Sequence, residues 1–322
     1  MAIVKMNKIS VIGMEADKKE MLNRLMELGV VEINDPAEKL TDEEWTALVT
    51  RDGDEEEVSR LEKNLSQVDT ALEVLDQYDT SKRPLFASRR RMTDQAYQDV
   101  LKDDSRIRGV TEEVLSLHDE MTQLKTEENA KVSLRASLIP WSSCQIPLEQ
   151  EGTHSVRIFL GVMPAGNQTE LSGISLLREA VQTVSADSEI VQLGTDPTQL
   201  YLQVYCMRAD EGPVTETLKT HGFMQTSFHN LTGTVHENLV RLNKEISGLE
   251  SEQQQREERI RAYVPEIPAV RCYHDSLMIA RDKAAVSSSL LKTDQCFYFD
   301  GWFPAELQSK GEQILEQYDC CR

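Results

Sequence analysis

Aromatic residues and long apolar runs are both scarce in this chain of 322 residues. Aromatics make up 6% of the sequence and charged residues 28%, a balance that favours exposed helices over one large compact core. No window of about 18 consecutive apolar residues occurs, so the sequence predicts no membrane-spanning helix. The opening stretch MAIVKMNKIS also lacks the apolar core and the small-residue cleavage site of a secretion signal.

Positive charge is in deficit as well. The chain has 35 Lys and Arg against 55 Asp and Glu, which gives a formal net charge of -20. Phosphate backbones are bound by clustered cations that displace counterions, and a chain this negative is repelled by them. The composition therefore argues against nucleic acid as a partner, and against a broad docking surface on anionic lipid.

Catalytic and metal-binding motifs are missing too. There is no Gly-x-x-x-x-Gly-Lys-Ser/Thr loop and no Gly-x-Gly-x-x-Gly, so direct nucleotide binding is not expected. The six cysteines form no Cys-x-x-Cys pair, and reduced, mostly buried thiols are the expectation. His236 opens HENLV like a zinc helix, but Val240 stands where the second ligand belongs. We expect no enzymatic activity, no cofactor and no metal.

What the chain does contain is coiled-coil periodicity. Three stretches carry apolar residues at steps of three and four, which predicts helices that pack on one another by knobs into holes. The charged stretch ESEQQQREER is then a solvated helix face. The apolar positions are Val58, Leu61, Leu65, Val68, Leu72 and Leu75; Ile107, Val110, Val114, Leu117, Met121 and Leu124; and Val235, Leu239, Leu242, Ile246, Leu249 and Ile260.

Between the second and third stretches the pattern changes to strands and short helices. The predicted order is β-α-β-β-α-β, which matches a ferredoxin-like sandwich. Asp210 is the expected N-cap of the second helix and Gly222 its stop. The predicted strands are 154–163, 188–194, 199–207 and 223–229, and the predicted helices are 170–184 and 211–222.

The two ends of the chain fit together as a second lobe. Residues 5–33 predict β-α-β with Gly29 as the helix stop, and the stretch TDEEWTALV adds an amphipathic helical piece. Near the other end, the aromatic strand from Cys296 to Trp302 precedes a helix that begins at Pro304. We expect this strand to pair with the N-terminal strand KISVIG.

Strand alternation assigns the aromatic side chains to faces. Phe297 and Phe299 are predicted on one face and Tyr298 on the other, with Gly301-Trp302 turning the chain toward the next helix. Residues 319–322 would begin the strand that completes the lobe. We expect that strand to be absent or frayed, which leaves an open sheet edge.

Together these patterns predict an α+β fold with two ferredoxin-like α/β lobes joined by a long antiparallel coiled-coil stem. One lobe is split between residues 1–52 and 292–322. The stem comprises residues 53–138 and 232–291, with a helix at about 269–291 after two prolines, and the second lobe comprises residues 139–231. An out-and-back helical path is what brings the two termini together.

Several segments also resemble one protein family, in order along the whole chain. They are MAIVKMNKISVIGMEADKKEMLNRLMELGVVEI, SKRPLF, HSVRIFLGVMP and FDGWFP. They resemble landmarks of the I subunit of bacterial and archaeal V-type (A/V-type) ATPases, the counterpart of eukaryotic subunit a. The order of these segments and the match to the predicted architecture carry the resemblance.

The resemblance implies a non-catalytic stator arm that resists torque at the cytoplasmic face of a membrane. In that family, two lobes bridged by a coiled coil hold peripheral stalks built from E and G subunits. An integral membrane half carries the proton or sodium half-channel and faces the rotor ring. This chain is expected to be a soluble piece without its C-terminal membrane domain, so no ion-channel residue can be assigned to it.

One basic stretch runs against the overall charge. The segment SKRPLFASRRR contains Lys82, Arg83, Arg89, Arg90 and Arg91. It is interpreted either as a solvated loop between helices or as a docking patch for an acidic stalk subunit or for lipid headgroups.

Two other functional classes remain open. A ligand-sensing regulator is one, because ferredoxin-like lobes also bind amino acids, although Gly161, Gly166, Gly173 and Gly194 form no tight motif. A free coiled-coil scaffold that dimerises through its apolar seams is the other. Pairing of the seams within one chain is the interpretation we favour, because it explains why the halves of the split lobe lie at opposite ends of the sequence.

Overall fold

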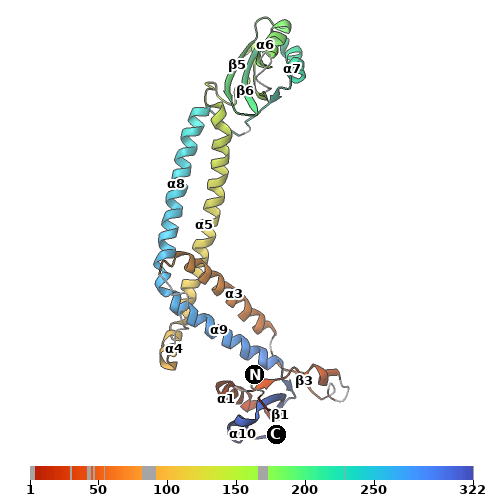
Figure 1. Ribbon diagram of the computed structural model, residues 1–322, viewed down its shortest axis with the longest axis vertical. Helices are drawn as coiled ribbons and strands as arrows, with labels where there is room; N and C mark the ends of the chain where they lie inside the picture. Colours follow the sequence, from red (N-terminus) through yellow and green to blue (C-terminus); the bar gives the residue numbers. More distant parts are fainter. Residues whose placement is uncertain are drawn as a thin grey trace. The chain divides into compact units, whose positions relative to one another are not determined.

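The computed structural model of the chain combines helices with two β-sheets, which confirms the α+β class (Figure 1). It describes residues 4–29, 31–41, 45, 48–53, 55–81, 92–165, 173–228 and 230–321. The chain divides into two compact units, Met1–Ser116 with Ile260–Arg322 and Leu117–Arg259. Each unit therefore has its own packing, and each is described separately below.

The first unit is built on a sheet to which both ends of the chain contribute. Its strand order is β10-β1-β9-β8-β3, and β2 also pairs with β9. Strands β1 and β9 pair antiparallel from Met6↔Pro304 to Met14↔Cys296, which confirms the predicted pairing of the aromatic strand. The strands are β1 (Met6–Met14), β2 (Glu32–Ile33), β3 (Thr50–Arg51), β8 (Leu291–Lys292), β9 (Cys296–Pro304) and β10 (Cys320–Cys321).

Two helices contribute to the apolar core of this sheet, α1 (Lys18–Leu28) and α10 (Gln308–Leu315). Gly29 ends α1 at a φ of 68°, the left-handed conformation that the sequence predicts for this stop. The core consists of Val11, Met21, Leu22, Leu25, Leu290, Phe297, Phe299, Phe303 and Leu315. Large aromatic side chains thus supply much of the buried area that holds the two ends of the chain together.

The alternation along β9 is as predicted. Phe297 and Phe299 are buried in the core, whereas Tyr298 contacts Trp45, which is not part of it. The predicted turn at Gly301-Trp302 is wrong, because β9 continues through Pro304. A Cβ atom on Gly301 would lie 2.5 Å from the carbonyl oxygen of Glu32. Glycine is therefore present here because β2 approaches closely, and not because the chain turns.

The final strand is short but present. Cys320 and Cys321 pair with Gly13 and Ile12 of β1, and the thiol of Cys320 donates to the carbonyl oxygen of Leu315 at 3.2 Å. We expected this strand to be absent or frayed; it is present, and its pairing extends over two residues. The local contact with α10 explains why so short a strand is held on the sheet.

Besides α1 and α10, the described helices of the first unit include α3 (Glu55–Tyr78), α4 (Asp94–Leu101) and α9 (Ile267–Ser288). Helices α3 and α9 pack antiparallel, as two contacts show: the ion pair of Asp76 with Arg271 at 3.0 Å and the contact of Asp69 with the His274 ring at 3.0 Å. The first apolar seam therefore packs on α9. The buried side chains of α3 are Leu61, Leu65, Val68, Ala71, Val74 and Leu75.

The long helices α5 (Asp104–Leu138) and α8 (Val235–Ala262) carry the second and third seams. In the second unit they lie side by side and antiparallel (Figure 1). Arg256 pairs with Glu120 at 3.1 Å, whereas Lys131 pairs with Glu245 at 2.8 Å. The residue number rises along α5 as that of its partner in α8 falls, which shows that the two helices are antiparallel. Leu117, Met121, Leu242, Ile246 and Leu249 are buried, as the seam pattern predicts.

The sheet of the second unit has the order β5-β6-β4-β7 and is antiparallel throughout. Helices α6 (Gly173–Val184) and α7 (Glu211–Thr220) pack with it. Their shared core is Phe159, Met163, Leu177, Val181, Ile190, Leu202, Val204, Cys206, Val214, Leu218 and Phe223. The strands are β4 (Val156–Pro164), β5 (Glu189–Thr195), β6 (Gln199–Met207) and β7 (Met224–Gln225).

A second apolar cluster joins this sheet to the ends of α5 and α8. Trp141, in the short 3-10 helix Ile139–Trp141, is 2% exposed and lies edge-on to Tyr201 and Phe228 at 5.2 and 5.3 Å between ring centroids. The cluster also contains Leu138, Cys144, Leu148, Leu160, Leu193, Val235 and Leu242. The tryptophan thus fills the junction between sheet and helices.

Two local features of this unit differ in detail from the expectation. The last strand covers two residues rather than all of 223–229. Asp210 stands at the N-cap position of α7, but its side chain accepts a hydrogen bond from the Ser185 hydroxyl at 2.8 Å and caps no helix N–H. The carboxylate therefore ties α7 to the end of α6.

The helical piece predicted at TDEEWTALV lies largely outside the described residues. Among the helices that are described, none is long and apolar enough to cross a membrane. The remaining short helices are 3-10 turns at Glu15–Asp17, Pro36–Thr41, Arg208–Asp210, Val264–Glu266 and Ala305–Leu307.

Candidate functional site

The basic segment singled out in the sequence is not part of the described structure. Lys82, Arg83, Arg89, Arg90 and Arg91 all lie outside the described residues. Within the described ranges, no group of three or more His, Cys, Asp or Glu side chains is placed to hold a metal ion. In the first unit we consider two side-chain clusters and one groove as candidate surfaces.

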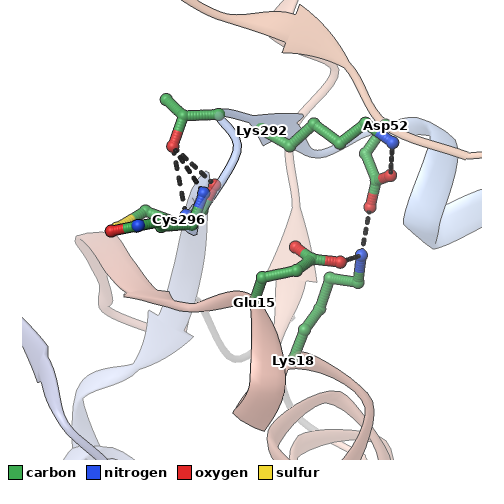
Figure 2. A network of polar contacts seen from close by, with 7 residues as sticks. Glu15, Lys18, Asp52, Lys292 and Cys296 are labelled. Atoms are coloured by element: carbon green, nitrogen blue, oxygen red, sulfur yellow. Dashed lines mark hydrogen bonds and ion pairs between the residues drawn. The ribbon is translucent and has the colours of Figure 1, made fainter.

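The first cluster is a buried carboxylate between two lysines (Figure 2). Asp52 is 7% exposed and accepts from Lys18 at 2.7 Å and from Lys292 at 2.9 Å. Lys18 is the first residue of α1, Lys292 belongs to β8, and Asp52 follows β3. The backbone N–H of Asp52 also donates to the carbonyl oxygen of Leu290 at 3.0 Å. One carboxylate thus joins three segments that are distant in sequence.

Burial and hydrogen bonding act on Asp52 in opposite directions. Burial alone would raise the pKa of this carboxyl, but hydrogen bonds from Lys18, Lys292 and the N–H of Gly53 outweigh it and hold the pKa below 3.8. Lys18, which also bonds Glu15, has its pKa raised, because its two carboxylate partners outweigh the opposing effect of burial. Asp52 is therefore a charged structural tie at neutral pH.

The second cluster is aromatic and lies around Tyr298. Lys39 sits over the rings of Tyr298 and Trp45, with Nζ 4.0 and 4.7 Å from the ring centroids, and pairs with Asp300 at 3.0 Å. Asp300 also accepts from the Ser10 hydroxyl at 2.6 Å. Burial would raise the pKa of Asp300, but bonds from Ser10, Tyr298 and Lys39 outweigh it and lower this pKa.

A cavity of about 380 Å³ adjoins this second cluster. Its charged side chains are satisfied locally, because Lys39 pairs with Asp300 and Asp35 pairs with Arg51 at 2.7 Å. Those pairs already occupy the groups that a charged ligand would need. The residues that line the cavity are Lys8, Asn34, Asp35, Pro36, Lys39, Tyr298, Phe299 and Asp300.

The groove lies between α1 and α9 and has a cavity volume of about 380 Å³. We call it the α1–α9 groove. Its lining is Lys18, Lys19, Leu22, Asn23, Met26, Glu57, Ala280, Lys283, Ala284, Val286 and Ser287. Lys19 and Lys283 are exposed, and neither forms an ion pair among the described residues. Within the described ranges, these two lysines are the charged groups of the groove without an ion-pair partner.

Sequence reasoning did not single out the α1–α9 groove, although one signal was present. The apolar residues of α1 include Met26 beside Met21, Leu22 and Leu25. Only the latter three are buried in the helix, and Met26 lines the groove instead. An apolar face that is wider than the core can bury indicates a second surface.

Comparison with known proteins gives one curated relative. No family model matches the chain. The chain is 20% identical over 327 aligned positions to "A-type ATP synthase subunit I" of Methanocaldococcus jannaschii. The alignment covers 97% of this chain and 46% of that protein. The chain thus spans about half the length of the relative that it matches. A solved structure, "Crystal structure of the cytoplasmic N-terminal domain of subunit I, homolog of subunit a, of V-ATPase", is similar with a TM-score of 0.47 and 16% identity, over 98% of this chain and 99% of that one.

Proposed function

We propose, from the premise that this chain is a relative of subunit I of the A/V-type ATPases, that it is the non-catalytic stator arm of a rotary ATPase. The arm anchors the peripheral stalk subunits E and G to the ion-translocating membrane sector and resists the torque of the rotor. The observation that carries the proposal is the sequence match along nearly the whole chain.

The domain organisation of this proposal follows the sequence. Residues 1–52 and 292–322 form a ferredoxin-like lobe near the membrane, and residues 139–231 form the second such lobe. The strand order β5-β6-β4-β7 in the second unit supports the ferredoxin-like assignment, because that sandwich places its first and third strands in the centre. The stem, residues 53–138 and 232–291, is a coiled coil, which resists bending better than a flexible linker.

Antiparallel helix pairs within one chain support the mechanical role. Between α5 and α8, Arg256 pairs with Glu120, and Gln253 donates to Glu128 at 2.6 Å. Such cross-helix contacts, repeated along a buried apolar seam, hold two helices in one register. In the assembled enzyme we place this arm at the cytoplasmic face, joined to a C-terminal membrane domain that contacts the rotor ring.

Binding to the stalk is the direct test. Purified chain is titrated with the E/G heterodimer of the same organism, and association at micromolar concentration or tighter is expected, without ATP hydrolysis by the chain alone. The mixture is followed by calorimetry and analytical ultracentrifugation. Absence of any association at micromolar concentration overturns the stalk-anchoring role.

The basic segment has its own test under this proposal. Reversing the charge of Arg89, Arg90 and Arg91 to glutamate is expected to weaken stalk binding at low salt, because exposed charge pairs act mainly through screened attraction. The effect should shrink as salt is raised. Unchanged affinity at low salt identifies this segment as a solvated loop.

A ligand-sensing regulator is the alternative, and the cavity beside Tyr298 is the observation on its side. A thermal-shift screen against amino acids and nucleotides separates the two functions. The stator proposal expects no shift, because the charged groups of that cavity pair with one another.

A further inference from the structure

We infer that the α1–α9 groove is the docking site for an acidic amphipathic helix of a partner protein, with Lys19 and Lys283 pairing with the acidic residues of that helix. This inference deepens the proposed stator function, because it names the surface and the chemistry by which the arm would hold a helical partner. Four observations on the described residues lead to it.

The walls of the groove are two helical stripes. On α1, Lys19, Leu22 and Met26 recur at i, i+3 and i+7, and on α9, Ala280, Lys283 and Ser287 recur at the same spacing. Positions three, four and seven apart lie on one face of a helix. A groove with helical ridges on both sides accepts a third helix, whose own ridges fit between them.

The floor of the groove is apolar. Leu22, Met26, Ala280, Ala284 and Val286 supply its apolar surface. Burial of such surface under a partner is favourable in proportion to the area removed from water. The apolar lining therefore favours an occupant with an apolar face.

The apolar surface also continues beyond the groove. Ile279 is 45% exposed and stands four residues before Lys283, so it lies on the same side of α9. Its exposure adds apolar surface next to Ala280, at the edge of the groove. The lining residues of α9 already run from Ala280 to Ser287, about two turns at roughly 3.6 residues per turn, so an occupant of more than one turn is favoured over a small molecule.

The charge of the groove differs from that of the protein. Three of the four charged residues in its lining are lysines, the fourth being Glu57, in a chain whose net charge is -20. Lys18 is already engaged by Asp52, whereas Lys19 and Lys283 are not paired with any described carboxylate. Opposite charges at the rim of an apolar groove raise the association rate and set the register of the partner.

A helix with an apolar stripe and acidic residues on both sides of it would match the lining of the groove. A partner helix with leucine-like residues facing Leu22 and Met26 and with Glu or Asp on both flanks meets one free lysine on each wall. A basic or neutral helix would leave that charge unmatched. The groove thus distinguishes partners by charge as well as by shape.

The test compares two probes and two pairs of variants. The probes are the E/G heterodimer and a synthetic amphipathic helix of roughly 18 residues with a leucine face and glutamate flanks, long enough to be helical. The chain carrying Lys19→Glu and Lys283→Glu is expected to bind both probes about fivefold or more weakly than the unchanged chain at low salt. Asn23→Trp fills the groove without removing a buried side chain. This variant should weaken the binding of both probes at any salt concentration.

The matched control carries Lys63→Glu and Lys310→Glu. Both lysines are exposed and belong to the same unit as the groove. The two substitutions change the net charge by the same amount as Lys19→Glu with Lys283→Glu. This control should bind both probes within about twofold of the unchanged chain. Circular dichroism of every variant confirms that the helices are intact.

The outcomes separate the groove from the stator function. If the heterodimer binds but the groove variants bind as tightly as the control, the groove inference is overturned and the stator function stands. If the peptide binds in the groove and the heterodimer does not bind at all, the stator function fails while the groove remains a helix site. If the peptide fails to bind and vesicles with anionic lipid are bound through Lys19 and Lys283, the site belongs to a membrane surface and the inference is wrong.

Discussion

Among single residues, Asp52 has the most consequences for stability. It is nearly fully buried, it pairs with lysines from α1 and β8, and its backbone bonds the residue before β8. A buried carboxylate with two cationic partners is compensated, and loss of its charge leaves both lysines facing a neutral group. The stability of the first unit should therefore follow the charge of this one side chain.

Asp52→Asn is expected to destabilise the first unit by about 2 kcal/mol, the usual worth of charged hydrogen bonds. The lowered pKa of Asp52 means that its contribution is present above pH 3.8 and is lost as the pH falls through the folded-state pKa. The variant should thus lose less stability on acidification than the unchanged chain. Urea unfolding at several pH values measures both effects, with exposed Asp99→Asn as control.

Asp196, in the turn between β5 and β6, is a second residue with a defined titration. Its carboxylate accepts from the hydroxyls of Tyr201 and Thr198 and from the N–H groups of Thr198 and Gln199. These bonds, that of Tyr201 first, lower the pKa of Asp196 from 3.8 to about 2. The turn is therefore held by a carboxylate that stays ionised in mild acid.

Tyr201→Phe should raise the pKa of Asp196 toward 3.8, because the bond from the tyrosine hydroxyl favours the ionised form. A carboxyl-carbon NMR titration measures the value directly. Tyr205→Phe, on the same strand, should leave it unchanged. If Asp196 titrates at 3.8 in the unchanged chain, the hydrogen-bonded turn is wrong.

At the scale of elements, the close approach of β2 to β9 depends on a residue without a side chain. A Cβ atom on Gly301 would lie 2.5 Å from the carbonyl oxygen of Glu32, too close for any real contact. The strands must then move apart, and the pairs Glu32↔Trp302 and Ile33↔Gly301 weaken. The pairing of β2 with β9 therefore requires glycine at position 301.

Gly301→Ala is expected to cost about 1 to 3 kcal/mol, as overpacking typically does. Gly109→Ala is the matched control in the same unit, because nothing lies within 4 Å of its added Cβ and it stands inside α5. Alanine should stabilise that helix by about 1 kcal/mol. Thermal unfolding should show a lower melting temperature for Gly301→Ala and a higher one for Gly109→Ala. Equal effects of the two substitutions would contradict the close approach of β2 to Gly301.

Helix pairing shows how the same periodicity has two outcomes. The seams of α5 and α8 pack on each other in the second unit, whereas the seam of α3 packs on α9. Helix α9 buries Ile267, Val270, Tyr273 and Leu277. A heptad-like pattern predicts a partner helix, but it does not identify that helix.

On the scale of the whole molecule, pairing within the chain predicts a monomer. The apolar seams and their ion pairs are satisfied by helices of the same chain, as with Arg271–Asp76 and Lys131–Glu245. Light scattering should give the mass of one chain, 36.6 kDa, over a wide range of concentration. A dimer whose mass does not change on dilution would instead indicate pairing between chains and favour the scaffold alternative.

Much of the fold follows from local sequence signals, and the candidate site does not. Period-two alternation assigns Phe297 and Phe299 to the core and Tyr298 to the opposite face, and Gly29 marks the end of α1. Gly301 was misread as a turn because β2 approaches it closely, and Asp210 stands at the expected N-cap position but its side chain accepts from Ser185 instead of capping the helix. The α1–α9 groove joins residues more than 200 positions apart, and no local pattern specifies such a pairing.

The sequence by itself determined the helix seams, the pairing of the aromatic strand with the N-terminal strand and the family resemblance, because these depend on residue type and spacing along the chain. The tertiary structure decided which helix each seam meets, that Asp52 lies between two lysines, and that Lys19 and Lys283, beside an apolar groove, pair with no carboxylate in the described part of the chain. Pair energies depend on distance and burial, and both are properties of the folded chain.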